Sequence, residues 1–396
     1  MTTEGSNEIS GIISFFSSGD IFGMLIMAPM ADVYGRRAVI LAGGVLVAIF
    51  SFASALSPNI YYLIVARMLV GVGIGASNTV LYDLFAETVP TIHRNLIGYL
   101  YLFVLIGSEY VILSCYLFLT KYGWRITIVS CSIPILIVVC VGYIFIPESP
   151  RWLVSIGKHE EAKILLQNAA LLNGTTNVVG EIIIEHPKGN EKMSYNQLFF
   201  GHNYHVTVAL WLVWLLTQFA HSCVYFTIIN SFAVGQCDYQ YGLLALIISL
   251  QTIGIVGSTN IMNYLGRVSS QMCCFTIASA AMLLYGLISV YGNSKTWATS
   301  MLSLSQIASL SGISVLWVHT VELFPTEVHS LFIILPMFVR LKFLLLCFYT
   351  NNFSPILLCL SHALSHGPLS LSLSFSLHVH VYINIFINII ISAFVC

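Results

Sequence analysis

Nine long apolar stretches, separated by polar segments, constrain the fold of this chain more than any other feature. They cover residues 11–31, 38–57, 60–85, 96–119, 126–146, 205–233, 241–262, 271–292 and 297–319. A transmembrane helix needs about 20 mostly apolar residues. The apolar residues run continuously instead of alternating with polar ones, which favours helices over the strands of a membrane barrel. The sequence therefore predicts an all-α membrane protein.

The composition agrees with a membrane setting. Of the 396 residues, 58% are hydrophobic and 8% are charged, whereas soluble domains contain about 25% charged residues. The net charge of −1 gives no indication of a nucleic-acid partner. The ten cysteines are scattered, so neither a disulfide framework nor a metal site is expected. We expect a monomer in the lipid bilayer, without a cofactor.

Basic residues set the expected orientation, because cytoplasmic connections are rich in Lys and Arg. If residues 1–10 lie outside, the cytoplasmic connections carry Arg36, Arg37, Arg94, Arg151, Lys158, Lys163, Lys188, Lys192 and Arg267. The opposite side carries Lys121, Arg125 and Lys295. This bias predicts a non-cytoplasmic N-terminus and a cytoplasmic segment 147–203.

Segment 147–203 divides the apolar stretches into two groups. Near its start, Ser149 and Pro150 form an N-cap followed by proline at the first helical position. Small and apolar residues at helical spacing continue as far as Asn173-Gly174, a typical helix end. We expect amphipathic helices here, joining an N-terminal half-bundle at 1–146 to a C-terminal half-bundle at 204–330.

Two polar motifs occur twice, at nearly the same separation. "AETVPTIHR" at 86–94 is repeated as "VELFPTEVH" at 321–329, 235 residues later. Gly-Arg at 35–36 is repeated at 266–267, 231 residues later. Repetition in the same order indicates two pseudo-symmetric halves, as in parallel-repeat transporters. The alternative is that Glu and Pro merely mark the ends of loops.

The charged residues of these motifs predict a cluster on the cytoplasmic side. Gly35 permits a tight turn, and Asp32 lies at a helix end, where it can meet an arginine or a helix N-terminus. We expect further pairs within a set at this side of the membrane: Arg36, Arg37, Glu87, Arg267 and Glu322. The cluster would stabilise a state closed to the cytoplasm. The alternative is that Asp32 only caps a turn and aids insertion.

A glycine-rich stretch lies inside the third apolar span, where Gly71, Gly73 and Gly75 follow Arg67. The stretch has neither the preceding strand nor the ribose partner of a dinucleotide site. Close helix packing through small residues is therefore the better interpretation. Arg67 is costly inside a membrane, so it should face the bundle interior or a water-filled cavity.

Two acids lie deep within predicted spans, Asp20 and Glu109. A carboxylate at membrane depth indicates a proton or cation site. The alternative is a buried polar group paired with Arg67 or with a Ser or Tyr hydroxyl. Asp83 lies closer to the cytoplasmic end of its span and is expected to be interfacial.

One helix of the second half presents polar and aromatic side chains at spacings of three or four, namely Trp214, Gln218, His221 and Tyr225. Residues at this spacing share a helical face, and such a face suits an organic solute. Trp317 and His319 near the end of another span are further candidates. An interfacial aromatic belt would explain Trp317 equally well.

Taken together, these motifs resemble those of the major facilitator superfamily, in particular the synaptic vesicle two-related proteins and the organic ion transporters, with sugar porters more distant. The matching residues are Asp32, Gly35, Arg36, Arg37, Arg67, Gly71, Gly73, Gly75, Glu87, Pro90, Arg94, Gly123, Trp124, Arg125, Pro147, Glu148, Ser149, Pro150, Arg151, Glu322, Pro325 and Thr326. The resemblance covers about residues 10–330. It implies two six-helix bundles that move a solute through a central cavity by alternating access.

The sequence departs from the family pattern at both ends. Its first span resembles the family's second helix, so the first helix is expected to be missing, and 1–146 and 204–330 would hold helices two to six and seven to ten. Ala28 and Asn263 replace a family Gly and Asp. Residues 331–396 form an atypical apolar, low-complexity tail with His378 and His380. A translated non-coding stretch or a faulty gene model is preferred there over a metal tract.

The expected function is secondary active or facilitative transport of a small organic solute, with organic ions as candidate substrates and H+ or Na+ as candidate coupling ions. The plasma membrane and intracellular vesicles are both candidate locations. The alternatives are a transport-inactive truncated protein, a vesicle-resident receptor or scaffold, and a sugar porter. An enzyme is not expected, because the sequence lacks a His-Glu-x-x-His motif, a Walker loop and a nucleophile elbow.

Overall fold

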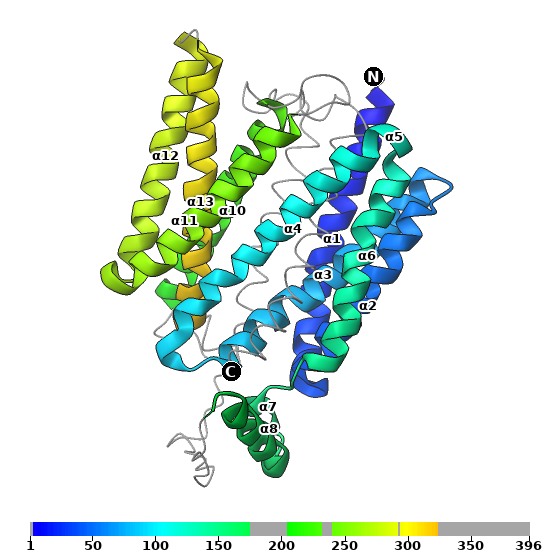
Figure 1. Ribbon diagram of the computed structural model, residues 1–396, viewed down its shortest axis with the longest axis vertical. Coiled ribbons are helices and arrows are strands. Elements are labelled where there is room, and N and C mark those ends of the chain that lie inside the picture. Colours follow the sequence, from blue (N-terminus) through cyan, green and yellow to red (C-terminus); the bar gives the residue numbers. More distant parts are fainter. Residues whose placement is uncertain (1–2, 175–203, 232–239, 292–293, 324–396) are drawn as a thin grey trace.

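The protein is a bundle of long helices with two short helices at one end (Figure 1). The computed structural model describes residues 3–174, 204–231, 240–291 and 294–323. Within these ranges the regular elements are all helices, which confirms the predicted all-α membrane fold. The repeated segment beyond 323 and the tail 331–396 lie outside the described residues.

The elements of the first part of the chain are α1 (Thr3–Tyr34), α2 (Arg36–Ala55), α3 (Ile60–Thr88), η1 (Thr91–Tyr99), α4 (Leu100–Ser114), η2 (Cys115–Leu119), α5 (Thr120–Tyr122) and α6 (Trp124–Phe145). Two short helices follow, α7 (Pro150–Ser155) and α8 (His159–Leu172). The last described elements are α10 (Tyr204–Ser231), α11 (Tyr241–Leu265), α12 (Arg267–Tyr291) and α13 (Lys295–Leu323).

Each of the nine predicted spans corresponds to a long helical segment. Eight of these segments are long and apolar enough, in the described part of the chain, to cross a membrane. The remaining one, α10, has a shorter apolar stretch at Thr207–Gln218. Helices α3 and α13 run past the predicted ends of their spans, so Glu87 and Glu322 lie in last helical turns and not in loops.

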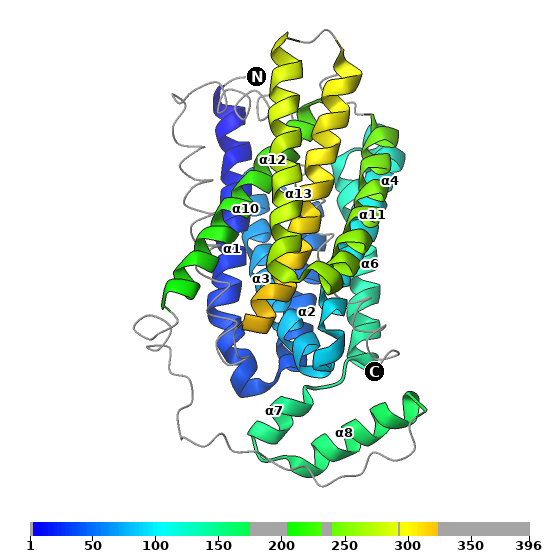
Figure 2. The ribbon, with the colours of Figure 1, turned by 90° about the vertical axis from the view of Figure 1, so that its left-hand side faces the viewer.

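The helices pack in two groups that meet along α4. In the first group α3 packs against α1 and α2, and α2 also packs against α6. In the second group α13 packs against α10, α11 and α12. Helix α4 runs diagonally between the groups and packs against α11 (Figures 1 and 2), and η1 packs against both α11 and α13. Two groups joined in this way agree with a bundle of two halves.

Glycines allow α1 to lie directly against α3. A Cβ atom at Gly75 would meet the backbone oxygen of Asp20, and one at Gly71 would meet that of Phe16. Gly73 instead faces α2, where a Cβ would lie 2.7 Å from the backbone oxygen of Gly43. The predicted packing through small residues is therefore seen on two sides of α3.

Replacement of Gly75 by leucine is expected to prevent this packing. The added side chain collides with backbone, which cannot move aside as a flexible side chain does, and overpacking costs about 1–3 kcal/mol or more. We expect a lower yield of monodisperse protein and a lower melting temperature. Gly257→Leu on α11 is the matched control, because a Cβ there meets nothing within 4 Å. Equal melting temperatures for the two variants would contradict this account.

The short helices have the predicted ends. Ser149 is the N-cap of α7, where its hydroxyl accepts a hydrogen bond of 3.2 Å from the backbone N–H of Trp152. Helix α8 ends at Leu172, and Gly174 has a positive φ of 69°. In Figure 1 both helices lie below the bundle, at the end where α1 connects to α2. Lys295 lies at the opposite end, at the start of α13.

This separation gives a test of the predicted orientation. We expect Lys158→Cys to react with an impermeant thiol reagent only after the cytoplasmic side is exposed, and Lys295→Cys to react in intact cells. The unaltered chain supplies the background from native cysteines. The test requires protein at the plasma membrane. Labelling of Lys158→Cys in intact cells would contradict the predicted orientation and support the opposite one.

Candidate functional site

The turn between α1 and α2 is built around Gly35, which has a φ of 100°. The carboxylate of Glu148 accepts hydrogen bonds from the backbone N–H groups of Arg36 (2.9 Å) and Arg37 (3.2 Å). Glu148 therefore occupies the N-terminus of α2, where a negative charge is favourable. A Cβ on residue 35 would lie 2.5 Å from a Glu148 oxygen, so the turn needs glycine for space as well as for backbone angle.

The Arg36 guanidinium joins two carboxylates. Its Nη2 lies 3.0 Å from Asp32 Oδ1 and 3.2 Å from Glu87 Oε1. The Glu87 side chain is 2% exposed, whereas that of Asp32 is 45% exposed. Arg37 instead donates to the backbone oxygen of Tyr143 at 2.7 Å. Asp32 thus meets an arginine, and Glu148 is the residue that meets the helix N-terminus.

The second half repeats the arginine–glutamate contact. Gly266 has a φ of 82°, and Arg267 follows it as the first residue of α12. Arg267 Nε and Nη2 each lie 2.8 Å from a different oxygen of Glu322, a bidentate arrangement. In both halves, the arginine after a positive-φ glycine therefore meets the glutamate at the end of a later helix. Asn263 stands where the first half has Asp32 and can form no ion pair.

The other charged residues of the motifs occupy different surroundings. Arg67 is 1% exposed inside the bundle, as its cost in a membrane predicts. Arg94 lies in η1, and Arg151 is exposed in the first turn of α7. Asp83 is 8% exposed and lies one turn before Glu87, so it is buried within the protein near the end of α3.

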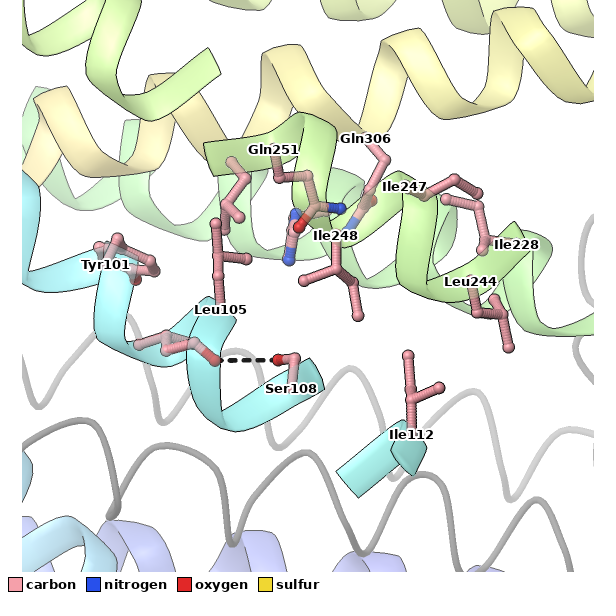
Figure 3. A pocket seen from close by; sticks show the side chains of 13 residues that line it. Tyr101, Leu105, Ser108, Ile112, Ile228, Leu244, Ile247, Ile248, Gln251 and Gln306 are labelled. Atoms are coloured by element: carbon pink, nitrogen blue, oxygen red, sulfur yellow. Dashed lines mark hydrogen bonds between the residues drawn. The ribbon is translucent and has the colours of Figure 1, made fainter. Parts of the chain in front are cut away.

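A cavity of about 140 Å³ lies between the two halves. Helix α4 forms one wall, and α10, α11 and α13 form the other, as Figure 3 shows. Its polar lining residues are Tyr101, Ser108, His221, Gln251 and Gln306, and the rest are aliphatic. The described lining carries no Asp, Glu, Lys or Arg.

Gln306 offers this cavity a hydrogen-bond acceptor. The residue is 4% exposed, and its Oε1 atom makes no hydrogen bond with the described part of the chain. Gln251, 5% exposed, faces the same space (Figure 3). A buried acceptor without a partner costs about 1–3 kcal/mol. A solute with a hydroxyl or N–H donor would satisfy it.

Four aromatic side chains, here called the aromatic cluster, lie beside the cavity: Tyr82, Tyr101, Trp214 and Trp317. Trp317 stacks on Tyr82 with ring centroids 3.9 Å apart and planes inclined by 6°. Its Nε1 atom donates a hydrogen bond of 2.9 Å to the Tyr101 hydroxyl. Tyr82 and Tyr101 belong to the first half, and Trp214 and Trp317 to the second. The cluster therefore joins the halves.

The structure distributes the predicted cavity residues over several sites. His221 lines the cavity, and its Nδ1 lies 3.1 Å from Ser309 Oγ. Trp214 and Trp317 are each 2% exposed, so Trp317 belongs to no interfacial belt. His319 Nδ1 lies 3.3 Å from Gln271 Oε1, away from the cavity.

Two further predicted residues, Asp20 and Gln218, also lie away from the described cavity lining. Asp20 lies on α1 against α3, and Gln218 is half-buried on α10. The side chain of Tyr225 lies outside the described residues. No group of three or more His, Cys, Asp or Glu side chains suited to a metal ion occurs in the described ranges.

Glu109 makes a contact between the halves. It lies on α4 and accepts a hydrogen bond of 2.8 Å from the hydroxyl of Ser249 on α11. The pairing matches the alternative in which the acid meets a serine hydroxyl. Because α4 and α11 belong to different halves, relative motion of the halves would break this hydrogen bond.

Sequence reasoning missed most of the polar lining. Gln251 and Gln306 each lie inside a predicted apolar span, and an amide at membrane depth is itself a signal of an internal partner. Ser108 gave no comparable signal, because a serine hydroxyl in a membrane helix can bond to the backbone of its own helix. Ser108 does so here, donating to the backbone oxygen of Val104 at 3.0 Å. Tyr101 gave none because tyrosine is common near the ends of membrane spans.

Comparison with known sequences assigns the chain to a family. The profile described as "Sugar (and other) transporter" matches residues 2–395. The synaptic vesicle 2-related protein of Bos taurus is 25% identical over 81% of this chain and 60% of its own length. Organic anion transporter 3 of Homo sapiens is 27% identical over 80% of this chain and 58% of its own length. The chain thus spans about three fifths of these relatives.

The fold also matches a solved transporter structure. The proton:xylose symporter XylE of E. coli, bound to 6-bromo-6-deoxy-D-glucose, superposes with a TM-score of 0.72 over 99% of this chain and 86% of its own. The sequence identity is 18%, so this likeness concerns the fold alone. The chain is a multi-pass membrane protein that belongs to the sugar (and other) transporter family and has the fold of the major facilitator superfamily.

Proposed function

We propose that this protein moves a small organic solute across the membrane by alternating access, as a secondary active or facilitative transporter. The observation that carries the proposal is the cavity between the halves, with its polar lining and the free acceptor of Gln306. Residues 1–146 and 204–330 would be the two moving half-bundles, and 147–203 their cytoplasmic connection. The halves would rock about the enclosed solute.

Support for this motion comes from the kind of contact between the halves. The aromatic cluster, the Glu109–Ser249 hydrogen bond and a hydrogen bond of 3.0 Å from the Tyr99 hydroxyl to Asn260 cross between them. The ion pairs Arg36–Glu87 and Arg267–Glu322 each stay within one half. Aromatic contacts and hydrogen bonds to a hydroxyl group can separate without breaking an ion pair. The ion pairs would keep each half rigid during the motion.

Organic ions are the first candidate substrates, because a relative is named an organic anion transporter. A sugar or related polyol is the second candidate. The described cavity lining favours this candidate. Its polar groups are amides, hydroxyls and an imidazole, and it contains no Asp, Glu, Lys or Arg. Amides and hydroxyls recognise hydroxyl groups through directional hydrogen bonds.

Uptake into proteoliposomes by the full chain tests the proposal. Labelled organic anions, organic cations and neutral polyols are supplied separately. We expect saturable uptake of at least one class and a loss of about fivefold in Gln306→Leu, since one hydrogen bond to a solute contributes about 1 kcal/mol. Gln167→Leu on α8, away from the cavity, is the matched control. Absence of uptake in every class by correctly folded protein would favour a transport-inactive receptor or scaffold.

Glu109 gives a separate test of proton coupling. We expect Glu109→Gln to retain uptake but to lose its dependence on external pH, because the amide cannot bind the proton. Ser249→Ala is the control, since it removes the 2.8 Å hydrogen bond and keeps the carboxylate. Uptake would be measured from pH 5 to 8. An unchanged pH profile in Glu109→Gln would leave Glu109 with only a structural role.

A further inference from the structure

A second cavity lies at the cytoplasmic end of the bundle, far from the solute cavity. Its volume is about 490 Å³. One wall comes from the ends of α3 and α6 and the start of α7, and the other from α8. The apolar residues that shape it include Phe145, Pro147, Ile164, Leu165, Ala169 and Leu172. We call this space the α8 groove.

The apolar face of α8 is not covered by the described protein. Ile164 is 55% exposed and Leu172 is 67% exposed, although both line the α8 groove. Among the described elements α8 packs mainly against its neighbour α7. Apolar surface that is exposed to water is stabilised by burial against another apolar group. An apolar occupant would therefore be stabilised here.

The α8 groove continues onto the lipid-facing surface of α6. Tyr143 and Ile144 in the last turn of α6 are 68% and 71% exposed, and the span they end begins at Trp124. Phe145, the next residue, is 44% exposed and lines the groove. A molecule in the bilayer can thus reach the groove along α6, past the exposed apolar side chains of Ile144 and Phe145.

Arg37 and Tyr143 indicate how deep in the membrane the groove entrance lies. Arg37 Nη2 donates 2.7 Å to the Tyr143 backbone oxygen, and its guanidinium lies 5.9 Å from the centre of the Tyr143 ring. Arginine and tyrosine gather at the level of lipid headgroups. The groove entrance therefore lies at the boundary between headgroups and acyl chains. Eight of the eleven residues that line the groove are apolar, and the polar ones are Thr88, Glu161 and Asn168.

We propose that the α8 groove binds an acyl chain of a bilayer phospholipid, which enters along α6 and holds α8 parallel to the membrane surface. The headgroup would stay at the level of Arg37 and Tyr143. The apolar residues Ile164, Leu165, Ala169 and Leu172 would contact the chain. Amphipathic helices at membrane surfaces bury their apolar faces among acyl chains in the same way. The site is separate from the solute cavity, so the proposal holds whether or not the protein transports.

Photolabelling of the full chain in nanodiscs tests the site. The probe is phosphatidylcholine with a diazirine near the end of one acyl chain, and adducts are located by peptide mass spectrometry. We expect adducts on Leu172, which lines the groove, in preference to Leu171, which is 69% exposed but does not line it. These neighbours have the same side chain and nearly the same exposure, so only the groove distinguishes them.

A matched pair of variants tests occupancy. Ala169→Trp fills the groove and is expected to lower the adduct yield on 159–174 by about fivefold or more, since the bulky indole takes the space of the chain. Ala170→Trp, at the next position but outside the lining, should leave the yield unchanged. Equal yields in both variants, no adducts on α8, or a preference for Leu171 would each overturn the proposal. If Ala169→Trp does not fold, the distribution between Leu171 and Leu172 decides.

Discussion

Arg36→Ala is expected to destabilise the protein by about 3–5 kcal/mol, the usual cost of leaving a buried charge without its partner. Glu87 is 7% exposed, and the Arg36 guanidinium lies 3.2 Å from its carboxylate. The substitution also leaves Asp32 without its 3.0 Å contact. The measurement is the melting temperature of purified protein, together with the yield of monodisperse protein.

Two further variants separate charge from packing. Arg36→Ala combined with Glu87→Gln removes the stranded charge, so a large part of the lost stability should return. Arg267→Ala is the counterpart in the second half, where the side chains of Arg267 and Glu322 are 31% and 24% exposed. We expect a smaller loss there, about 1 kcal/mol. Equal losses in Arg36→Ala and Arg267→Ala would contradict the role given to burial.

The clusters of charge do not themselves connect the halves. Instead of one cluster, two separate sets of pairs form: Arg36 with Asp32 and Glu87 in its own half, and Arg267 with Glu322 in the other. If these ion pairs favour a state closed to the cytoplasm, they do so by fixing the shape of the half in which each lies. One contact that does cross between the halves is aromatic, the stacking of Tyr82 on Trp317.

The sequence predicted those features that depend on neighbours along the chain. The spans followed from continuous apolar runs, and the ends of α7 and α8 followed from Ser149, Pro150 and Gly174. The ion pairs could be predicted because each half contains an arginine after a glycine and a glutamate near the end of a later helix. These are Arg36 with Glu87 and Arg267 with Glu322. Repetition therefore carried information about contacts that a single motif lacks.

Features that depend on how distant helices approach each other could not be predicted. Tyr101 lines the cavity and accepts a hydrogen bond from Trp317, 216 residues later. Nothing in the sequence indicates that these two residues meet. Trp214 and His221 share a helix, yet His221 lines the cavity and Trp214 packs against Trp317. A shared helical face shows which residues lie together, but not which depth of the bundle they reach.

Trp317→Ala is expected to open the cytoplasmic side of the pathway. In the structure Trp317 is 2% exposed, stacks on Tyr82 at 3.9 Å and meets the Trp214 ring edge-on at 4.8 Å. Removal of a buried tryptophan costs about 3–5 kcal/mol. If the aromatic cluster separates when the cytoplasmic side opens, this cost falls on the closed state alone. A difference of about 3 kcal/mol shifts a two-state equilibrium by roughly 150-fold.

The shift can be measured as access to the solute cavity from the cytoplasm. Ser108 is 5% exposed and lines the cavity, so Ser108→Cys reports its opening to an impermeant thiol reagent in inside-out vesicles. We expect Trp317→Ala to raise the labelling rate by about tenfold or more, because a larger fraction of molecules is open. Trp297→Ala is the matched control on the same helix, since Trp297 is 64% exposed near the opposite end of α13. If both variants label Ser108→Cys at the rate of the parent chain, the aromatic cluster does not close the pathway.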